Sequence, residues 1–177
     1  MTSAHAFCPQ CARPLVPRAH AGSPDLLRHS CPDDGCGYVH WDNPVPVVAA
    51  VVEHEGSLIL ARNKAWSAPF FALITGFLEK ADPSPEEAVA REVKEELDLD
   101  ALAVNFIGHY RFERQNQIIL AFHVPASGVI TLGDELAEYK RIEPARARYW
   151  PVATGLALRD WLRSQGHDPQ AFEVPKV

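Results

Sequence analysis

Residues 76–99 read GFLEKADPSPEEAVAREVKEELDL, which is the most strongly patterned stretch of the chain. Ser84 followed by Pro85, with Glu87 three residues after the serine, is typical of a helix N-terminus with a capping box. We therefore expect a helix that starts at residue 85 and ends at about Leu97 or Asp98. A short apolar strand ending at Gly76 is expected before it.

The predicted helix carries clustered carboxylates on one face. At about 100° per residue, Glu92, Glu95 and Glu96 fall together, whereas Val93 and Leu97 belong to a separate apolar stripe that would pack on a sheet. Like charges at these spacings destabilise a helix by a few tenths of a kcal/mol per pair, about 0.2–0.5. A solvated face with salt bridges is one interpretation. The other is a site for a hard divalent cation, Mg²⁺ or Mn²⁺, held by oxygen ligands.

The charge of the whole chain is concentrated in this segment. The 177 residues include 17 Lys and Arg against 23 Asp and Glu, a formal net charge of −6. Nine acids and three bases lie between residues 79 and 100, so that segment alone accounts for the net charge. The negative balance argues against a broad basic surface for nucleic acid.

Composition and length favour a globular protein. Apolar residues make up 47% and charged residues 23%, and the length suits one domain plus a small module. No apolar run approaches the ~20 residues that cross a membrane. The first residues lack the basic flank and apolar core of a signal peptide, so we expect a cytoplasmic protein without a membrane partner.

Four cysteines near the N-terminus form two close pairs, Cys8 with Cys11 and Cys31 with Cys36. This layout is typical of a zinc ribbon, in which four thiolates hold a structural Zn²⁺. A metal is expected because about 40 residues bury too little apolar surface to fold alone. Two disulfides are the alternative, which a cytoplasmic location disfavours.

The same N-terminal segment contains four histidines, His5, His20, His29 and His40. A mixed cysteine and histidine site is therefore a further alternative. Residues 13–30 are rich in proline and alanine, so we expect a loop between the two cysteine pairs. We place the zinc ribbon at residues 1–43 and a second domain at residues 44–177.

The second domain alternates strand and helix patterns. A β-branched run at residues 47–54, a turn at Glu55-Gly56 and an apolar run at residues 57–62 predict a hairpin. Further strands are expected at residues 103–112, 117–124 and 146–150. Thr154 is expected to cap a final helix that ends near Gly166. This order indicates an α+β fold with one mixed sheet rather than a doubly wound parallel fold.

The stretch quoted above resembles the Nudix box, Gx5Ex7REUxEExGU with U aliphatic. Gly76 and the core Arg91-Glu92-Val93-x-Glu95-Glu96 match the pattern. Three features differ from the pattern, and two of them precede Arg91: one extra residue separates Gly76 from Arg91, and Asp82 lies nearest to the place of the first glutamate. Asp98 replaces the later glycine and is one of the residues that tolerate a left-handed helix cap.

The ribbon followed by the stretch from Cys36 to Pro44 and a Val-Val-Ala strand is similar to the zinc-ribbon branch of the Nudix hydrolase family. That branch includes NADH pyrophosphatases and FAD or ADP-ribose pyrophosphatases. The Ser-Gln-Pro-Trp-Pro-Phe-Pro run of the NADH enzymes is absent, and residues 111–117 stand there instead. The resemblance implies an α/β/α sandwich after the ribbon, and it covers roughly residues 7–151.

The resemblance also implies an activity, the Mg²⁺-dependent (or Mn²⁺-dependent) hydrolysis of the pyrophosphate bond in a nucleoside diphosphate joined to another group. Substrates of the ADP-ribose, FAD or NADH type would release a nucleoside monophosphate. The implied metal ligands are Glu92, Glu95 and Glu96, oriented by Arg91. A sensor or regulator that keeps the fold and binds a nucleotide metabolite with little turnover is the alternative.

The sequence also offers candidates for the general base and for substrate binding. The general base is one of the helix glutamates or comes from residues 134–138, where Glu138 aligns slightly better than Glu135. The candidate substrate-binding residues are Gly76, Arg62, Phe71 and Arg114. Trp66 and Phe70 would stack on a base or pack in the core, and packing is favoured. The expected partner is a nucleotide-derived small molecule, with nucleic acid unfavoured and a homodimer expected from the resemblance.

Overall fold

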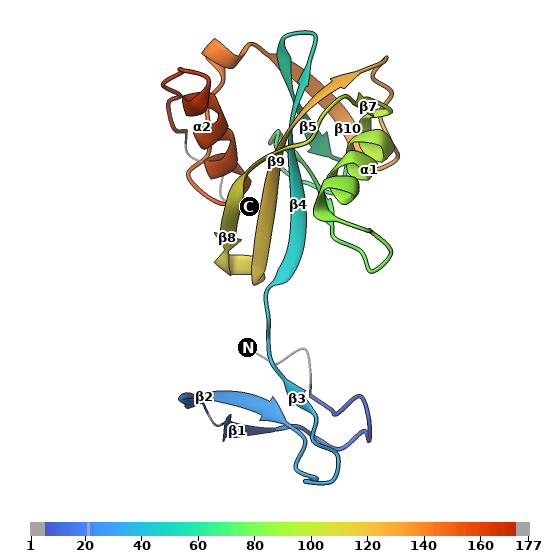
Figure 1. Ribbon diagram of the computed structural model, residues 1–177, viewed down its shortest axis with the longest axis vertical. Helices are drawn as coiled ribbons and strands as arrows, with labels where there is room; N and C mark the ends of the chain where they lie inside the picture. Colours follow the sequence, from blue (N-terminus) through green and yellow to red (C-terminus); the bar gives the residue numbers. More distant parts are fainter. Residues whose placement is uncertain (1–5, 21, 173–177) are drawn as a thin grey trace. The chain divides into compact units, whose positions relative to one another are not determined.

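The computed structural model of the protein describes residues 6–20 and 22–172, so the predicted candidate His5 lies outside the described residues. The chain divides into two compact units, Met1–Asn43 and Pro44–Val177 (Figure 1). Within the described part, no helix is both long enough and apolar enough to cross a bilayer.

The smaller unit is a three-stranded antiparallel sheet of β1 (Val16–His20), β2 (Ser23–Ser30) and β3 (Val39–His40), in that order. The loop expected at residues 13–30 is therefore wrong, because most of that segment is a β-hairpin. Its backbone pairs from Val16 opposite Ser30 to Ala19 opposite Leu27. The side chains do not alternate between apolar and polar because the unit buries little: its buried described residues are Cys8, Ser30 and Cys31.

The larger unit is built on a seven-stranded mixed sheet whose main path runs β10-β5-β4-β9-β7, with β6 on β4 and β8 on β9. The strands are β4 (Val45–His54), β5 (Ser57–Asn63), β6 (Ile74–Phe77), β7 (Asp100–Ala101), β8 (Asn105–Phe112), β9 (Gln117–Ser127) and β10 (Leu136–Ile142). The β4 and β9 strands are parallel, and the other pairs are antiparallel. The predicted hairpin turn is confirmed, since Glu55 and Gly56 both have positive φ, 50° and 72°.

Two predictions for the C-terminal half are wrong. Residues 134–138 are expected as a loop, but the segment from Leu136 to Ile142 forms β10 against β5. Residues 146–150, expected as a strand, instead follow a 3₁₀ turn (η2, Pro144–Arg146) and contribute an isolated bridge from Tyr149 to Ala171. The half-exposed pattern of β10 hid it, because only Leu136 in that strand is buried.

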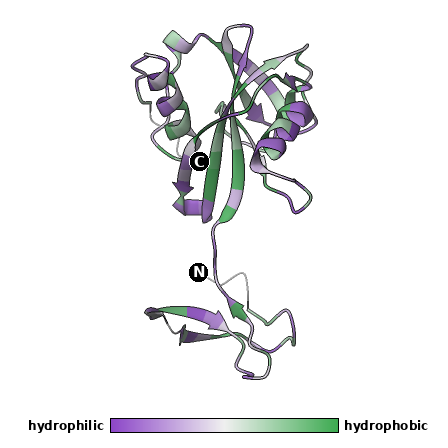
Figure 2. Ribbon diagram, in the orientation of Figure 1, coloured by the Kyte–Doolittle hydropathy of each residue, from purple (hydrophilic) through white to green (hydrophobic). Residues whose placement is uncertain are grey.

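Two helices cover opposite faces of the sheet, α1 (Pro85–Leu97) and α2 (Thr154–Ser164), so the predicted α/β/α sandwich is confirmed (Figure 1). Alternate residues of β4 face each helix. Val47, Ala49 and Val51 belong to the cluster that contains Leu158 and Leu162 of α2. Val48, Ala50 and Val52 belong to the cluster that contains Val89, Val93 and Leu97 of α1. Burial on both faces explains why this strand reads as a continuous apolar run (Figure 2).

The ends of α1 agree closely with the sequence. Ser84 is the N-cap, and its hydroxyl accepts a hydrogen bond from the backbone N–H of Glu87. Asp98 is the C-cap in the left-handed conformation, with φ 55°. For α2 the cap is Ala153, one residue before the predicted Thr154.

Gly155 lets α2 approach the preceding loop. A Cβ at this position would lie 1.9 Å from the backbone oxygen of Trp150 and 2.5 Å from its Cγ. We expect Gly155→Ala to reduce the free energy of unfolding by about 1–3 kcal/mol, the usual cost of overpacking. Urea unfolding measures this, with Arg163→Ala, at an exposed position of the same helix, as the control. Equal stability of the two variants would contradict the expected clash.

Candidate active site

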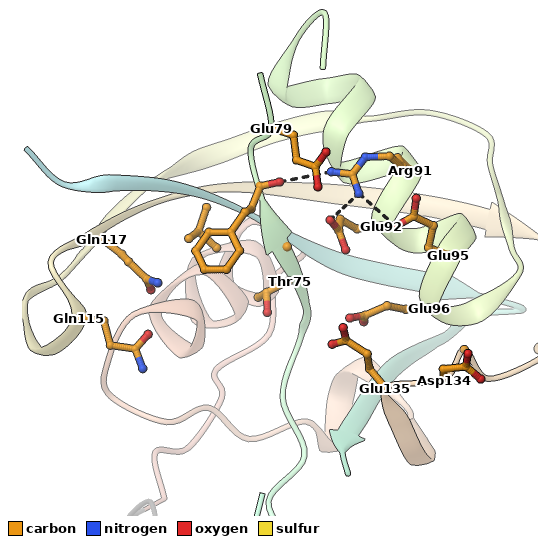
Figure 3. A pocket seen from close by; sticks show the side chains of 14 residues that line it. Thr75, Glu79, Arg91, Glu92, Glu95, Glu96, Gln115, Gln117, Asp134 and Glu135 are labelled. Atoms are coloured by element: carbon orange, nitrogen blue, oxygen red, sulfur yellow. Dashed lines mark hydrogen bonds and ion pairs between the residues drawn. The ribbon is translucent and has the colours of Figure 1, made fainter. Parts of the chain in front are cut away.

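A cavity of about 550 Å³ opens between α1, β6 and two loops (Figure 3). Its lining comes from the exposed helix face, from the end of β6, from the loop before β10, and from the hairpin that joins β8 to β9. The lining residues are Val47, Thr75, Gly76, Phe77, Glu79, Arg91, Glu92, Glu95, Glu96, Gln115, Gln117, Gly133, Asp134 and Glu135. The structure therefore brings Gly76, Arg91 and all three predicted helix glutamates to one cavity.

The cavity is strongly acidic. Six of its lining side chains are carboxylates and one is a guanidinium, that of Arg91. The lining residues thus carry a formal excess of negative charge, in a space where burial weakens solvent screening. A cavity of this kind repels phosphate groups unless cations enter with them.

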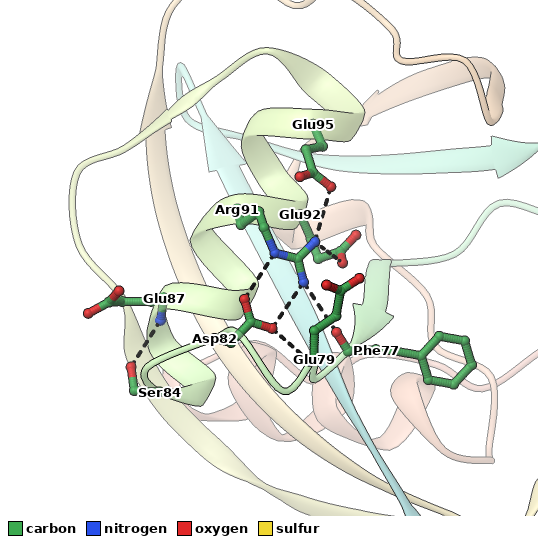
Figure 4. Close-up of polar contacts among 8 residues, drawn as sticks. All are labelled: Phe77, Glu79, Asp82, Ser84, Glu87, Arg91, Glu92 and Glu95. Atoms are coloured by element: carbon green, nitrogen blue, oxygen red, sulfur yellow. Dashed lines mark hydrogen bonds and ion pairs between the residues drawn. The ribbon is translucent and has the colours of Figure 1, made fainter.

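Arg91 is the centre of the polar contacts (Figure 4). Its Nη1 donates to Glu92 Oε1 at 2.7 Å and to Glu95 Oε2 at 3.1 Å. On the opposite edge, Nε and Nη2 donate to the two carboxylate oxygens of Asp82 at 3.1 and 3.2 Å. Nη2 also donates to the backbone oxygen of Phe77 at 3.2 Å. Its donors are thus shared among protein oxygens on three sides.

Gly76 is required by the position of Glu92. A Cβ on Gly76 would lie 1.8 Å from Cδ of Glu92, so any larger residue would displace that carboxylate. The Glu92 side chain is 13% exposed and occupies the space that the missing Cβ leaves. Glycine is therefore required at position 76 so that the Glu92 carboxylate can pack there.

The loop before β10 is attached to the C-terminal end of α1. Thr131 N–H donates to the Leu97 carbonyl at 3.0 Å, and Gly133 N–H donates to the Glu96 carbonyl at 2.9 Å. A Cβ on Gly133 would lie 2.5 Å from the Glu95 backbone oxygen. These contacts satisfy helix-end carbonyls and hold Glu135 across the cavity from Glu96 (Figure 3).

Burial and like charges act on the helix carboxylates. Burial, followed by the charges of Glu92, Glu135 and Glu95, raises the pKa of Glu96 to about 8. Burial also raises the pKa of Glu92, although the hydrogen bond from Arg91 opposes that effect. Outside the cavity, the hydrogen bonds from Arg91 hold the pKa of Asp82 below its usual value.

Four predicted residues are placed away from the cavity lining. Arg62 Nε donates to Glu138 Oε1 at 2.7 Å, so these two candidates pair with each other across β5 and β10. The Phe71 ring packs against the α2-side cluster, with Lys140 Nζ 3.9 Å from its centroid. Arg114 is exposed in the 3₁₀ turn η1 (Glu113–Gln115).

The two candidates for the general base, Glu138 and Glu135, lie in different surroundings. A bulge between Leu136 and Glu138 shifts the register of β10, and Glu138 is directed to Arg62. Glu135 lies before the bulge and lines the cavity. The sequence spacing alone could not show the bulge.

The aromatic residues before β6 do not line the cavity: Phe70 and Phe71 pack against the α2-side cluster, whereas Trp66 is 39% exposed. The Phe70 ring lies 5.2 Å from the Trp150 ring in an edge-to-face arrangement and 5.9 Å from the Trp66 ring. A different aromatic residue, Phe77, lines the cavity and is 59% exposed. Its position directly after the box glycine is a signal that the sequence contained.

Gln115 and Gln117 also line the cavity, and no sequence pattern marks them as site residues. They lie at the β8–β9 hairpin, far along the chain from the box. The parallel pairing of β9 with β4, in which Gln117 faces Val45, brings them to the site. Only the tertiary structure shows this.

The four cysteines converge in the smaller unit. All four are free thiols, and their sulfur atoms lie within 4.8 Å of one another, with Cys8 to Cys36 at 3.6 Å and Cys11 to Cys31 at 3.5 Å. Thiolates at about 2.3 Å from one zinc ion in tetrahedral geometry would be separated by similar distances. The cluster fits a zinc ribbon, and no histidine in the described part of the chain belongs to it.

The helix carboxylates are arranged differently. Within residues 6–20 and 22–172, the cysteines are the one group of three or more metal-ligating side chains that converge this closely. Glu92 and Glu95 turn to Arg91, whereas Glu96 faces Glu135 (Figure 3).

Comparison with known proteins agrees with the sequence resemblance. Residues 43–162 match the NUDIX domain. A protein of Stutzerimonas stutzeri (strain A1501) named NAD-capped RNA hydrolase NudC is 29% identical over 144 residues, which cover 81% of this chain and 48% of the relative. The Mycobacterium tuberculosis (strain H37Rv) protein of the same name is 33% identical over 132 residues, 71% of this chain and 39% of the relative. The chain thus spans about half the length, or less, of these relatives.

Solved structures share the fold. A NUDIX hydrolase from Nitrosomonas europaea has a TM-score of 0.74 and 21% identity, covering 96% of this chain and all of its own. An ADP-ribose pyrophosphatase from Streptococcus suis has a TM-score of 0.56 and 18% identity, covering 74% of this chain and all of its own.

The raised pKa of Glu96 predicts a pH-dependent stability. An unfolded glutamate titrates near pH ~4.3, whereas the folded-state pKa of Glu96 is about 8. Between these values the folded protein binds more protons, so its stability falls as pH rises and levels off above the folded-state pKa. Glu96→Gln should remove this contribution. Urea unfolding from pH 5 to pH 9 in buffer free of Mg²⁺ and Mn²⁺ tests it, and identical slopes for both proteins would contradict it.

Proposed function

The chain belongs to the NUDIX domain family, and on that premise we propose that it hydrolyses a pyrophosphate bond with the help of divalent cations. The substrate is a nucleoside diphosphate joined to a second group, of ADP-ribose, FAD or NADH type. One product is a nucleoside monophosphate. The observation that carries the proposal is the acidic cavity, which is lined by the three box glutamates and Glu135 and whose one guanidinium is already engaged.

The carboxylates fit Mg²⁺ or Mn²⁺. Hard oxygen donors are the ligands that these ions prefer. The proposed ligands are Glu92, Glu95 and Glu96. Burial and, after it, the neighbouring negative charges raise the pKa of Glu96, and a bound cation would offset both effects on the carboxylate. When bound, the cations supply charge neutralisation for the phosphates and make a coordinated water more acidic.

Two further roles fall to side chains of the protein: positioning the metal ligands and accepting a proton. Arg91 fixes Glu92 and Glu95 through hydrogen bonds and acts as a positioning residue, since its donors already bind protein oxygens. A carboxylate must accept the proton of the attacking water. We assign this role to Glu135, because it lines the cavity and Glu138 is paired with Arg62.

The neutral side of the cavity supports a substrate with a planar group. The exposed Phe77 ring offers a stacking surface, and the amides of Gln115 and Gln117 offer donors and acceptors for the edge of a base. A dinucleotide-like substrate uses both the acidic side and this neutral side. The names of the two relatives add NAD-capped RNA to the candidate substrates.

The structure gives no reason to prefer the sensor alternative. That alternative depended on the missing glutamate and the extra residue in the box. Asp82 nevertheless binds Arg91 through two hydrogen bonds, and Arg91 in turn contacts Glu92 and Glu95. The arrangement of the helix glutamates therefore supports turnover.

For the four cysteines we propose a structural Zn²⁺. Four thiolates complete a tetrahedral site, so no coordination position is left for a substrate. The smaller unit buries few apolar side chains, so a metal ion would contribute most of its folding free energy. The homodimer and the cytoplasmic location stay predictions.

A product screen tests the proposed function. The purified protein is incubated with ADP-ribose, FAD, NADH, NAD-capped RNA and nucleoside triphosphates, with Mg²⁺ and Mn²⁺ compared, and nucleoside monophosphate is quantified. We expect release from at least one dinucleotide-type substrate. Replacing Glu95 and Glu96 together by Gln should lower the rate by at least ~10²-fold, as expected when groups that stabilise transition-state charge are lost. Glu86→Gln, exposed on the same helix, is the control. Full activity in the double variant would refute the site assignment.

A matched pair of variants tests the proton acceptor. We expect Glu135→Gln to lower kcat by about 10²–10⁴-fold, the usual contribution of general acid–base catalysis. Glu138→Gln should affect stability more than kcat, because it removes only the partner of Arg62. Rates on the substrate found in the screen decide the assignment. A larger loss in the Glu138 variant would restore the order expected from the sequence.

Removal of zinc tests the role of the cysteines. A zinc-selective chelator should release one Zn²⁺ per chain and unfold the smaller unit, while the larger unit keeps its stability. Hydrogen exchange measured by mass spectrometry separates the two units. With excess Mg²⁺ present, hydrolysis of a small dinucleotide should continue. If chelation stopped hydrolysis while both units remained protected, the zinc would have a direct role in the chemistry.

A further inference from the structure

Asp82 lies at the back of the Arg91 guanidinium, away from the cavity (Figure 4). The two carboxylate oxygens of Asp82 accept from Nε and Nη2 of Arg91 at 3.1 and 3.2 Å, a two-point pairing that fixes the plane of the guanidinium. Oδ2 also accepts from the backbone N–H of Glu79 at 2.8 Å. The Asp82 side chain is 8% exposed.

This pairing is not part of helix capping. The N-cap of α1 is Ser84, whose hydroxyl receives the N–H of Glu87. Both oxygens of Asp82 are instead used by Arg91 and by the loop that precedes the helix. Asp82 therefore joins Arg91 to the loop that precedes the helix.

Asp82 lies at the two departures from the box pattern that precede Arg91. In Gx5Ex7RE the glutamate stands six positions after the glycine and eight before the arginine. Asp82 stands six positions after Gly76 but nine before Arg91. The chain thus combines a side chain that is shorter by one methylene with a loop that is longer by one residue, and the extra residue falls between Asp82 and Arg91.

We propose that these two departures compensate for each other, and that Asp82 is a positioning residue that sets Glu92 and Glu95 through Arg91. The longer loop brings the shorter carboxylate within hydrogen-bond distance of Nε and Nη2. With those two donors held, Nη1 is left to bridge Glu92 and Glu95. The inference rests on the proposed function for its catalytic meaning, but its geometry concerns only the protein's own side chains.

The way in which Arg91 shares its donors explains why the carboxylate of Asp82 is needed on the side of the guanidinium away from the cavity. A guanidinium has five N–H donors in a rigid planar fork, so fixing one edge determines where the other edge points. Without Asp82, only the Phe77 carbonyl would hold that edge of the guanidinium, and Arg91 could move toward the cavity and pair more fully with Glu92 and Glu95. Those carboxylates would then be less available to a divalent cation.

Four proteins test the compensation: the parent, Asp82→Glu, a deletion of Pro83, and the two changes together. The double change restores the box pattern, with glutamate followed by seven residues and then Arg91. The readout is Mn²⁺ affinity of the full zinc-loaded chain, measured by electron paramagnetic resonance. We expect each single change to weaken Mn²⁺ binding by about 10–100-fold, the usual effect of disturbing residues that orient metal ligands. The double change should recover most of that loss.

The test is a double-mutant cycle, so the decisive quantity is the interaction between the two changes. If their effects on log affinity simply add, or if either single variant binds Mn²⁺ as the parent does, the compensation is wrong. Asp82→Asn covers the case in which a single variant fails to fold, because it keeps the shape and removes the charge. A folded Asp82→Asn protein with the parent's Mn²⁺ affinity would also overturn the inference. Glu86→Gln is the matched control for the loss of one charge on this segment.

Two further readouts separate this inference from the proposed function. If the parent binds Mn²⁺ but hydrolyses no compound of the panel, the proposed function fails, and the Mn²⁺ affinities still decide the role of Asp82. If hydrolysis occurs, a positioning role predicts that the variants lose kcat at subsaturating Mn²⁺ and regain much of it at high Mn²⁺. A loss of thermal stability without that Mn²⁺ dependence would mean a structural role only, and would overturn the inference.

Discussion

Repulsion among the carboxylates of one cavity is the constraint on which the arrangement of this protein depends. Six acidic side chains line a space with a single guanidinium, and burial raises the pKa of Glu96 to about 8. Such an arrangement is unfavourable in isolation. It persists because Arg91 is held from both sides and because the backbone of the cavity belongs to well-packed elements.

The packing that offsets this repulsion is supplied by the other face of α1. Ala88, Val89, Val93 and Leu97 are buried against the sheet, and they hold the helix whatever the charge on its exposed face. The sheet itself is anchored by β4, which is buried on both faces between the two helices. Stability therefore comes from one side of the helix and chemistry from the other, a division expected where a functional site costs stability.

Agreement between sequence and structure was closest where the interactions are local. The helix bounds followed from Ser84, Pro85 and Asp98, and the face shared by Glu92, Glu95 and Glu96 followed from helical periodicity. Predictions failed where strand pairing decides. The half-exposed β10 and the β1–β2 hairpin gave no alternating pattern to read, and the register of β10, which places Glu138 beside Arg62, is not visible in the sequence.

By itself the sequence determined the family, the acidic helix, its partner Arg91 and the four cysteines, because each of these features depends on residues that lie close together along the chain. Tertiary structure alone decided which distant residues complete the cavity. Gln117 arrives through the parallel pairing of β9 with β4, and Glu135 arrives because the loop before β10 binds the carbonyls at the end of α1. The same holds for Asp82, whose shorter side chain is matched to a longer loop only when both are folded against Arg91. Spacing along the chain encodes a helix face, but contacts between segments depend on register, bulges and loop length.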